Sequence, residues 1–333
     1  MWALLIVSGI YILTFAFGTA GNLWVMVSMV RSRVCHIPSQ RPCSPRERSR
    51  VFIFFLAVAD FIVLLTIPFS LSQNLQVDWP FGSVLCRLHA AIDYSGKFFS
   101  VVILMSMSIE RYLIVCTRWR YVTSPKVIMT IPLVMGVLFS VIVPIIPQVI
   151  YTRLLTVVME GRDHRVCYQS IPTQLSPMYT SYTFAVGFAI PLCVMTICYI
   201  QLVQHVRKKF RERKQSRTSS QRPKYMCELT RSICRIAVFH FSCWAPFWFF
   251  NMAPIITESL EWNVLLEGKT WFEIGKLFAN MLPYINSAGN CILYAFLNRD
   301  IRKHIIWRPS SSNGRTITAL PSETITFNPS PTT

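Results

Sequence analysis

The first thirty residues, MWALLIVSGIYILTFAFGTAGNLWVMVSMV (Met1–Val30), contain no charged side chain. At about 1.5 Å of rise per residue, a helix of this length exceeds the roughly 30 Å hydrocarbon core of a bilayer. The stretch therefore predicts a membrane-spanning helix over residues 2–30. The whole chain agrees, because 53% of its 333 residues are apolar and only 14% are charged, against about 25% charged residues in soluble domains.

Six further apolar stretches follow the first along the chain. Their limits are 51–71, 86–116, 127–151, 177–204, 229–256 and 270–297. The sequence therefore predicts an all-α membrane protein built as a bundle of seven transmembrane helices. It shows no internal repeat of the kind that inverted-repeat transporters carry.

The charges are distributed unevenly between the gaps that separate these stretches. The chain has 33 Lys and Arg residues against 15 Asp and Glu residues, a net charge of +18. Of the 33 basic residues, 26 lie in segments 31–50, 111–126, 207–235 and 299–315. By the positive-inside rule these segments are cytoplasmic, which places the amino terminus outside and the carboxyl terminus inside. The excess charge thus reflects topology and attraction to the lipid bilayer, and argues against a nucleic-acid ligand.

The end of the chain differs in composition from the apolar stretches. Residues 308–333 include 11 Ser or Thr residues and several prolines. Such a segment buries too little apolar surface to pack, so we expect a disordered cytoplasmic tail. Its hydroxyl groups are acceptors for phosphate.

Polar residues recur inside the predicted helices, where inserting a charge costs roughly 2.5 to 3.5 kcal/mol. Asp60 lies near the middle of the second stretch and needs a partner cation, polar neighbours or a proton. Five other polar residues fall at similar depths in the first, third and seventh stretches: Asn22, Ser100, Asn286, Ser287 and Asn290. Together they would line a water-filled pocket for a small cation such as sodium, or form a static network of hydrogen bonds.

Two pairs of charges lie in the third stretch. Asp93 and Lys97 are four residues apart, on one face of a helix and within pairing distance. If they pair, the attraction of Asp93 for a cationic ligand weakens, and the sequence leaves both arrangements open. Glu110 and Arg111 lie at the cytoplasmic end of the same stretch, where long side chains also reach water.

The cysteines indicate one disulfide. Of the 11 cysteines, only Cys86 and Cys167 fall outside the predicted helices' interiors and on the extracellular side, where thiols are oxidised. A bond between them would tie the 150–176 loop over the mouth of the bundle. No spacing among the cysteines resembles a metal site.

Several short motifs occur in a family-specific order. They are Gly21-Asn22, Leu56-Ala57-Val58-Ala59-Asp60, Cys86, Glu110-Arg111-Tyr112, Pro191 with Tyr199, Cys243-Trp244-Ala245-Pro246 and Asn290-Cys291-Ile292-Leu293-Tyr294. Over residues 2 to about 307 the chain resembles the rhodopsin-like (class A) G-protein-coupled receptors. The resemblance implies a receptor domain at 1–307 in the plasma membrane, ending in a short amphipathic helix at 298–307.

Within that class, the chain resembles peptide receptors of the somatostatin, opioid and allatostatin C branch. The motifs that carry this likeness are Trp79-Pro80-Phe81-Gly82, Ile92-Asp93-Tyr94 and Phe250-Asn251. The resemblance implies an outer pocket in which Asp93 meets a basic residue of a peptide, with Lys97, Phe250 and Asn251 nearby. Tyr284 would steady Asp93, and Trp244 would serve as a pivot below the pocket.

The same resemblance implies a switch rather than a catalyst. Arg111 would turn toward a heterotrimeric G protein, of the inhibitory class, when helix six swings outward. Glu110, Tyr112, Tyr199, Pro246 and Tyr294 would complete this switch. Arrestin would bind the phosphorylated tail. The chain shows no nucleophile with its base and no nucleotide-binding loop, so we do not expect an enzyme.

Two other functions remain open at this point. A small-amine receptor also carries an Asp at the place of Asp93, but Thr183, Phe184 and Gly187 lack the paired serines expected for catechol hydroxyls. A seven-helix transporter would use the intramembrane charges as a proton or ion path.

A third alternative is a divergent receptor that couples weakly. Three positions depart from the family pattern: Met135 replaces a Trp, His240 a Phe and Cys291 a Pro. These changes fall in helices four, six and seven, and the last two would alter the packing of the switch.

Overall fold

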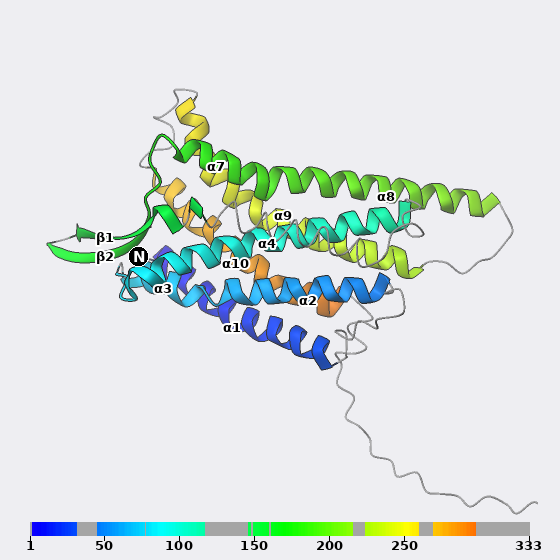
Figure 1. Cartoon of the computed structure of the whole chain (residues 1–333), viewed down its shortest axis with the longest axis horizontal. Coiled ribbons are helices and arrows are strands. Elements are labelled where there is room, and N and C mark those ends of the chain that lie inside the picture. The colour runs from blue at the N-terminus through cyan, green and yellow to red at the C-terminus, as the bar shows by residue number, and fades with distance from the viewer. Residues whose placement is uncertain are drawn as a thin grey trace, which may run out of the picture.

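The computed structural model describes residues 2–31, 45–76, 78–116, 146–147, 149–159, 161–215, 224–259 and 269–297. Its long helices run side by side along one axis (Figure 1). In chain order they are α1 (Trp2–Arg31), α2 (Pro45–Leu64), α3 (Ile67–Gln76), α4 (Gly82–Cys116), α7 (Ser176–Phe184), α8 (Ile190–Gln215), α9 (Lys224–Ser259) and α10 (Thr270–Leu297). The predicted fourth helix lies outside the described residues as far as residue 145, as do the predicted surface helix 298–307 and the tail 308–333.

Five helical stretches among the described residues are long and apolar enough to cross a membrane. They are Trp2–Arg31, Ser49–Gln73, Gly82–Cys116, Ser176–Lys208 and Ile233–Glu258. Helix α10 is of similar length, but Asn280, Asn286 and Asn290 lower its mean hydropathy. The described part of the chain is therefore a predominantly helical membrane protein, as predicted.

The second predicted helix is broken where α2 ends and α3 begins. Pro68 has no N–H group to donate, and its ring clashes with the carbonyl of Leu64, one turn earlier. The chain responds with a tight turn in which the Thr66 amide donates to the Val63 carbonyl at 3.1 Å. The Thr66 hydroxyl also donates to the Val63 carbonyl, at 2.7 Å. At this break the buried Thr66 side chain faces α4, where it lies beside Asp93.

The fifth predicted helix is interrupted in a different way. Between α7 and α8 lies η1 (Ala185–Ala189), one turn of π-helix. The amide of Ile190 bonds to the carbonyl of Ala185, five residues back. The turn precedes Pro191, which cannot donate to a carbonyl of the preceding turn. Such single π turns are frequent at functional sites.

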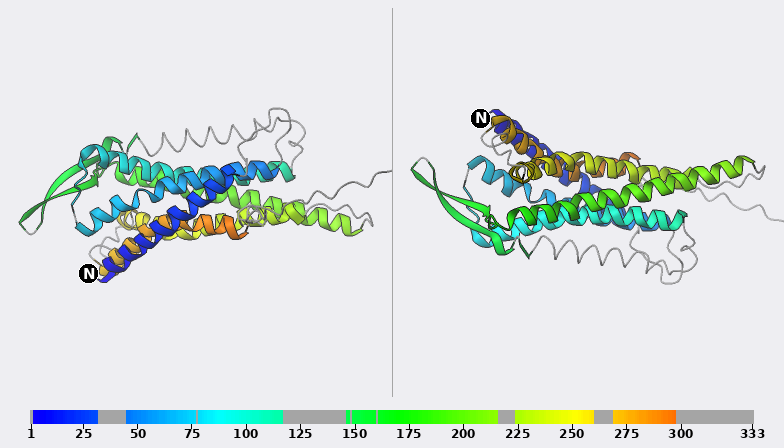
Figure 2. Two further views of the ribbon diagram at one scale, coloured as in Figure 1. Left: turned by 90° about the horizontal axis from the view of Figure 1, so that it is seen from below. Right: turned by 90° about the horizontal axis from the view of Figure 1, so that it is seen from above.

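A two-stranded hairpin departs from the all-α architecture predicted from the sequence. Strand β1 (Thr152–Met159) pairs antiparallel with β2 (Arg162–Gln169), and Leu154 faces Cys167 in the register. The turn includes Gly161, whose φ of 74° is a left-handed conformation that glycine adopts without strain. The hairpin projects past one end of the helices in every view (Figures 1 and 2).

The chain begins at the same end of the molecule as the hairpin (Figure 1). We call this the hairpin end. At the opposite end, the far end, α8 extends farthest (Figures 1 and 2). Segment 216–223 joins the far ends of α8 and α9 in the sequence.

The buried core has two larger apolar clusters with polar residues between them, and a third, small cluster of Phe98 and Val186. The far cluster includes Val25 of α1, Ala57 of α2 and Cys291 of α10. The cluster nearer the hairpin end includes the residues Tyr11, Val63 and Tyr284 of the same helices. Asn22, Asp60, Ser287 and Asn290 fall between these members along their helices and are themselves buried. We call this group, with Ser100 and Asn286, the polar layer.

Helix α1 approaches its neighbours closely at Gly18. A Cβ atom at this position would lie 2.7 Å from Leu64 Cδ1 and 2.8 Å from Ala288 Cβ. Both distances are shorter than carbon atoms tolerate without movement. The missing side chain therefore lets α1 carry Asn22 to α10.

Candidate functional site: outer pocket, polar layer and far-end pair

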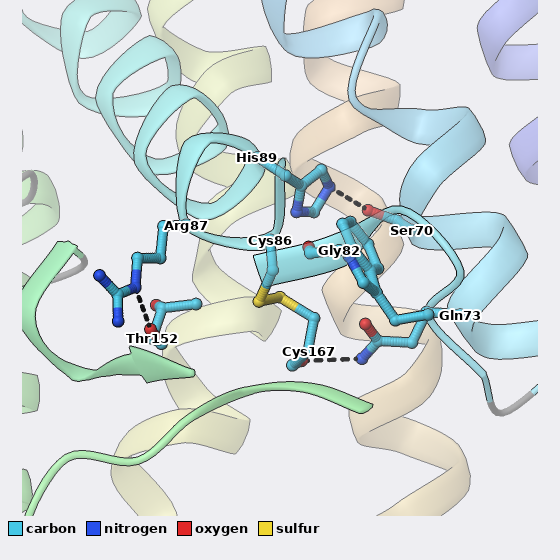
Figure 3. Close-up of a disulfide and its surroundings, with 9 residues drawn as sticks. Ser70, Gln73, Gly82, Cys86, Arg87, His89, Thr152 and Cys167 are labelled. Atoms are coloured by element: carbon cyan, nitrogen blue, oxygen red, sulfur yellow. Dashed lines mark hydrogen bonds between the residues drawn. A yellow bond between two sulfur atoms is a disulfide. The ribbon is translucent and has the colours of Figure 1, made fainter. Parts of the chain in front are cut away.

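A disulfide fixes the hairpin to the helices, as predicted. Cys86 in the first turns of α4 is bonded to Cys167 of β2, with their Cα atoms 5.6 Å apart. Gln73 Nε2 of α3 donates to the Cys167 carbonyl at 3.1 Å, and Arg87 Nε of α4 donates to the Thr152 carbonyl at 3.2 Å (Figure 3). Both strands are thus attached to helices that line the hairpin end.

Trp79 provides a second attachment for the hairpin. Its side chain is fully buried, and its amide donates to the Arg165 carbonyl at 2.6 Å. Its indole Nε1 donates to the Gly82 carbonyl at 2.9 Å. Phe69 and Phe81 pack against the ring at centroid distances of 6.3 and 5.2 Å. Trp79 therefore closes the corner between α3, α4 and β2.

Below this end, Asp93 and Lys97 form the pair that the sequence left open. Lys97 Nζ lies 2.5 Å from Asp93 Oδ2, and their side chains are 12% and 10% exposed. Thr66 Oγ1 lies 3.2 Å from the other carboxylate oxygen, so its single proton is shared between that oxygen and the Val63 carbonyl. Both oxygens of Asp93 therefore have partners within the chain. This arrangement satisfies a carboxylate that is costly to bury alone.

Two tyrosines extend this cluster toward α1 and α10. Lys97 Nζ lies 4.2 Å from the centroid of the Tyr284 ring, a cation–π contact. Tyr11 packs edge-on against Tyr284, at 5.5 Å between centroids. Lys97 is thus held by a carboxylate and by an aromatic face. Asp93, Lys97 and Tyr284, predicted as pocket residues, lie together.

The predicted pocket residues of α9 have other neighbours. Asn251 Nδ2 donates to the Phe247 carbonyl at 2.7 Å, one turn earlier in the same helix. Phe250 packs against Phe272 of α10, with ring centroids 5.2 Å apart. Among the described residues, neither Asn251 nor Phe250 bonds to Asp93 or Lys97. The structure therefore does not join them to the charged pair.

Trp244, the predicted pivot, lies in an aromatic stack inside α9. Its ring is 5.7 Å from the His240 ring and 6.4 Å from the Trp248 ring, centroid to centroid. Phe247 packs edge-on against it at 5.4 Å. Pro246 lies within the same helix. The indole Nε1 of Trp244 is buried without a hydrogen-bond partner among the described residues.

The polar layer brings Asp60 together with residues of two other helices. Ser100 Oγ of α4 donates to Asp60 Oδ1 at 3.3 Å, and Asn290 Nδ2 of α10 donates to Oδ2 at 2.9 Å. Asn22 Nδ2 of α1 donates to the Ser287 carbonyl at 3.1 Å. Asp60, Asn22 and Asn290 have no exposed surface.

The polar layer also contains acceptors that no described group satisfies. The side-chain oxygens of Asn22, Asn286 and Asn290 are buried without partners among the described residues. Amide oxygens and a carboxylate are the ligand atoms that hard cations prefer. The donor set therefore fits a small cation such as sodium. The described residues contain no group of three His, Cys, Asp or Glu side chains that would hold a transition metal.

His240 adds a residue to this layer that the sequence singled out only as a departure from the family. It is fully buried, and its Nδ1 lies 3.3 Å from Asn286 Nδ2. If the amide donates, Nδ1 accepts and the proton resides on Nε2. The imidazole is therefore part of the hydrogen-bonding layer that continues from α10 into α9.

At the far end of α4, Glu110 and Arg111 form a buried ion pair. Arg111 Nη2 lies 3.6 Å from Glu110 Oε2, and the side chains are 2% and 1% exposed. Arg111 Nη2 also bonds to Ser49 Oγ of α2. Tyr112 is half-buried beside them. The side chain of Tyr294 lies outside the described residues.

Arg111 and Tyr199 both line a cavity of about 530 Å³ between α4, α8 and α9. Tyr199 is 39% exposed. Two residues that the sequence assigned to one switch, one from α4 and one from α8, thus line the same space. No sequence motif indicated the cavity, because it depends on how far α8 and α9 stand apart.

Comparison with known proteins identifies the class of membrane protein that this arrangement represents. Residues 21–294 match the family described as 7 transmembrane receptor (rhodopsin family). The chain belongs to this family, which accounts for a bundle of seven transmembrane helices and favours a receptor over a transporter or an enzyme.

The curated relatives of the chain include a neuropeptide receptor and several somatostatin receptors. The chain is 28% identical to neuropeptide receptor 18 of Caenorhabditis elegans over 320 residues, which cover 90% of this chain and 66% of that protein. It is 30% identical to somatostatin receptor type 3 of Mus musculus over 324 residues, covering 92% and 69% of the two chains. It is 30% identical to somatostatin receptor type 2 of Sus scrofa over 302 residues, covering 88% and 74%. The chain spans about two thirds to three quarters of the length of these relatives.

The sequence did not indicate four features of these sites. They are the hairpin, the bond of Thr66 to Asp93, the bond of Arg111 to Ser49, and the cavity. The β-branched residues Thr152, Thr156, Val157 and Val158, followed by Gly161, were a signal for the hairpin. The other three have no local signal, because they depend on helix rotation and spacing.

Proposed function

We propose that this chain is a plasma-membrane receptor for a short, basic peptide and that it activates heterotrimeric G proteins of the inhibitory class. Its relatives include a neuropeptide receptor and somatostatin receptors, which supports a peptide ligand. The hairpin end faces the exterior and the far end the cytoplasm, in keeping with the positive-inside rule.

The observation that carries the peptide proposal is that Asp93 is buried and paired with a cation. Its carboxylate lies below the hairpin, nine-tenths buried, and its cationic partner is Lys97 of the same helix. A Lys or Arg side chain of the peptide would displace Lys97 Nζ from Oδ2 and form the charge-assisted bond itself. Lys97 would then remain over the Tyr284 ring, 4.2 Å from its centroid. Phe250, Asn251 and Trp244 of α9 would complete the pocket.

The response to the ligand would pass through the polar layer to the far end. A sodium ion at Asp60, with Ser100 and Asn290, would stabilise the arrangement in which α2, α4 and α10 are joined. When α9 swings outward around Trp244 and Pro246, Arg111 would leave Glu110 and contact the G protein. The set Tyr112, Tyr199 and Tyr294 would support that open state. Arrestin would bind the phosphorylated 308–333 tail.

The proposal is tested by the response to peptides. The receptor is expressed in cells, and guanine-nucleotide exchange is measured on membranes with a panel of basic linear and cyclic peptides. For a peptide that activates the wild type, Asp93→Asn should lower potency at least about tenfold, because the ion pair with the ligand is lost. Asp163→Asn, which removes the same charge from an exposed position in β2, should leave potency unchanged.

Lys97→Gln provides the complementary test. It removes the internal competitor for Asp93 and retains a hydrogen-bond donor, so the potency of the same peptide should rise several-fold. Equal potency in wild type and Asp93→Asn would exclude an ion pair between Asp93 and the peptide. A response to small amines alone, with no active peptide, would replace the peptide proposal by an amine receptor.

A further inference from the structure

The cavity between α8 and α9 has an amphiphilic lining. Most of its walls are apolar, with Phe188 and Met195 on the α8 side and Ile233 and Phe241 on α9. Helix α4 forms the floor with Ser108 and Arg111. At about 530 Å³, the space falls within the roughly 300 to 1,000 Å³ of pockets that hold small organic ligands.

The sequence of α9 explains why the two helices leave this space. Cys234, Ala237 and Ala245 line the cavity and follow one another at helical spacing along one face of α9. The Ala237 and Ala245 side chains are too small to fill the space toward α8, whose facing stripe includes Leu192, whereas Cys234 does contact Tyr199 of α8. The cavity is therefore determined by the residues of α9.

The mouth of the cavity lies between the two helices. Val238 and Tyr199, which line it, are 60% and 39% exposed. Both lie inside stretches long and apolar enough to span a membrane. Side chains exposed at such positions face hydrocarbon. The cavity thus opens toward the acyl chains of the bilayer.

Exposed basic residues follow at the far ends of the same two helices. Arg207 and Lys208 are on α8, and Arg231 and Arg235 are on α9. Arg207 follows the lining residue Leu202 by five residues in α8, and Arg231 precedes the lining residue Ile233 by two residues in α9. The positive charge therefore begins where the apolar walls end, at the depth where long cationic side chains reach lipid headgroups.

We propose that the α8/α9 cavity is a binding site for an anionic phospholipid of the cytoplasmic leaflet. One acyl chain occupies the cavity between Phe188 and Leu202, and the headgroup lies against Arg207 and Arg231. The apolar walls match the chain and the arginines match the negative charge. The site is separate from the Asp93 pocket, so the inference does not depend on a peptide ligand.

The experiment uses the full chain in phosphatidylcholine nanodiscs with a phosphatidylserine that carries a diazirine in one acyl chain. After irradiation, labelled peptides are mapped by mass spectrometry. Label is expected on the α8 and α9 segments that line the cavity. Unlabelled phosphatidylserine should compete about tenfold better than phosphatidylcholine. Competition by free palmitate that equals competition by phosphatidylserine would overturn the assignment to a phospholipid.

Matched variants separate the two parts of the site. Ala245→Phe fills the cavity and should reduce the label on α8 and α9 at least about fivefold, whereas Ala20→Phe, at an exposed position of α1, should not. The double variant Arg207→Gln and Arg231→Gln should keep the label but lose the preference for phosphatidylserine. Its control is Arg153→Gln in the hairpin.

The variants also define the results that would overturn the site. Unchanged labelling in Ala245→Phe would exclude the cavity as the place of the acyl chain. An unchanged preference for phosphatidylserine in the arginine variant would exclude the proposed headgroup contacts. That second measurement stands even if the filling variant does not fold.

Discussion

Asp60 places a carboxyl group at a position with no exposed surface. Ser100 and Asn290 donate hydrogen bonds to its oxygens, and the Ser287 side chain is a third hydrogen-bonding neighbour. These neutral donors offset only part of the cost of placing a carboxylate in the hydrocarbon region, roughly 2.5 to 3.5 kcal/mol on insertion scales. A bound cation would supply the remainder, and the unpaired oxygens of the Asn22, Asn286 and Asn290 side chains offer further ligand atoms.

We therefore predict that sodium stabilises the receptor through Asp60. At a sodium concentration about five times its Kd, binding contributes about 1 kcal/mol, which raises the melting temperature by about 2 °C for a protein of this size. The measurement compares thermal unfolding in sodium chloride and in choline chloride at equal ionic strength. Asp60→Asn should abolish the rise, and Asp93→Asn should retain it. A rise of the same size in Asp60→Asn would place the sodium elsewhere.

The residues of the polar layer were predictable from depth along each helix, because 1.5 Å of rise per residue fixes how far from a helix end each one lies. Rotation about the helix axis is not fixed in this way. The bonds from Thr66 to Asp93 and from Arg111 to Ser49 depend on that rotation. Sequence spacing within one helix did suggest that Asp93 and Lys97 can meet, but the choice between pairing and separation came from the structure.

At the scale of elements, the hairpin is the part of the fold that most shapes the mouth of the bundle. It is attached to α4 through Cys86, to α3 through Gln73 and to the chain before α4 through Trp79. The sequence indicated the covalent attachment through the location of two cysteines. It did not indicate the strands, because a membrane protein of this composition is dominated by helical signals. Pro68, in contrast, predicted a kink in the second helix, and the structure has a break at that place, between α2 and α3.

We predict that the disulfide positions the hairpin without determining the helices. The double variant Cys86→Ser and Cys167→Ser should lower ligand potency at least about tenfold, since the hairpin is no longer held over Asp93. Helical content by circular dichroism should remain as in the wild type. Cys193→Ser, which removes an exposed free thiol, is the matched control. Unchanged potency in the double variant would show that the bonds of Gln73 and Trp79 hold the hairpin on their own.

At the scale of the whole molecule, the arrangement links topology to compartment. The amino terminus and the hairpin share one end (Figure 1), and the disulfide at that end requires an oxidising environment. At the far end of the molecule, α8 ends and α9 begins, and segment 216–223 connects them in the sequence. This segment follows the basic run from Arg207 to Lys214. Charge distribution and disulfide chemistry therefore support, by separate arguments, the proposal that the two ends lie on opposite sides of the membrane.

This assignment gives the last prediction. An epitope tag inserted in the hairpin turn at Gly161 should bind antibody on intact cells, and a tag inserted after Thr218 should bind only after permeabilisation. The reason is that moving the basic segment 207–235 across the membrane would oppose the positive-inside rule. A tag at the amino terminus serves as the control and should behave like the Gly161 tag. Staining of the Thr218 tag on intact cells would show that the chain has the opposite orientation in the membrane. Arg111 would then lie on the side of the membrane that no G protein reaches.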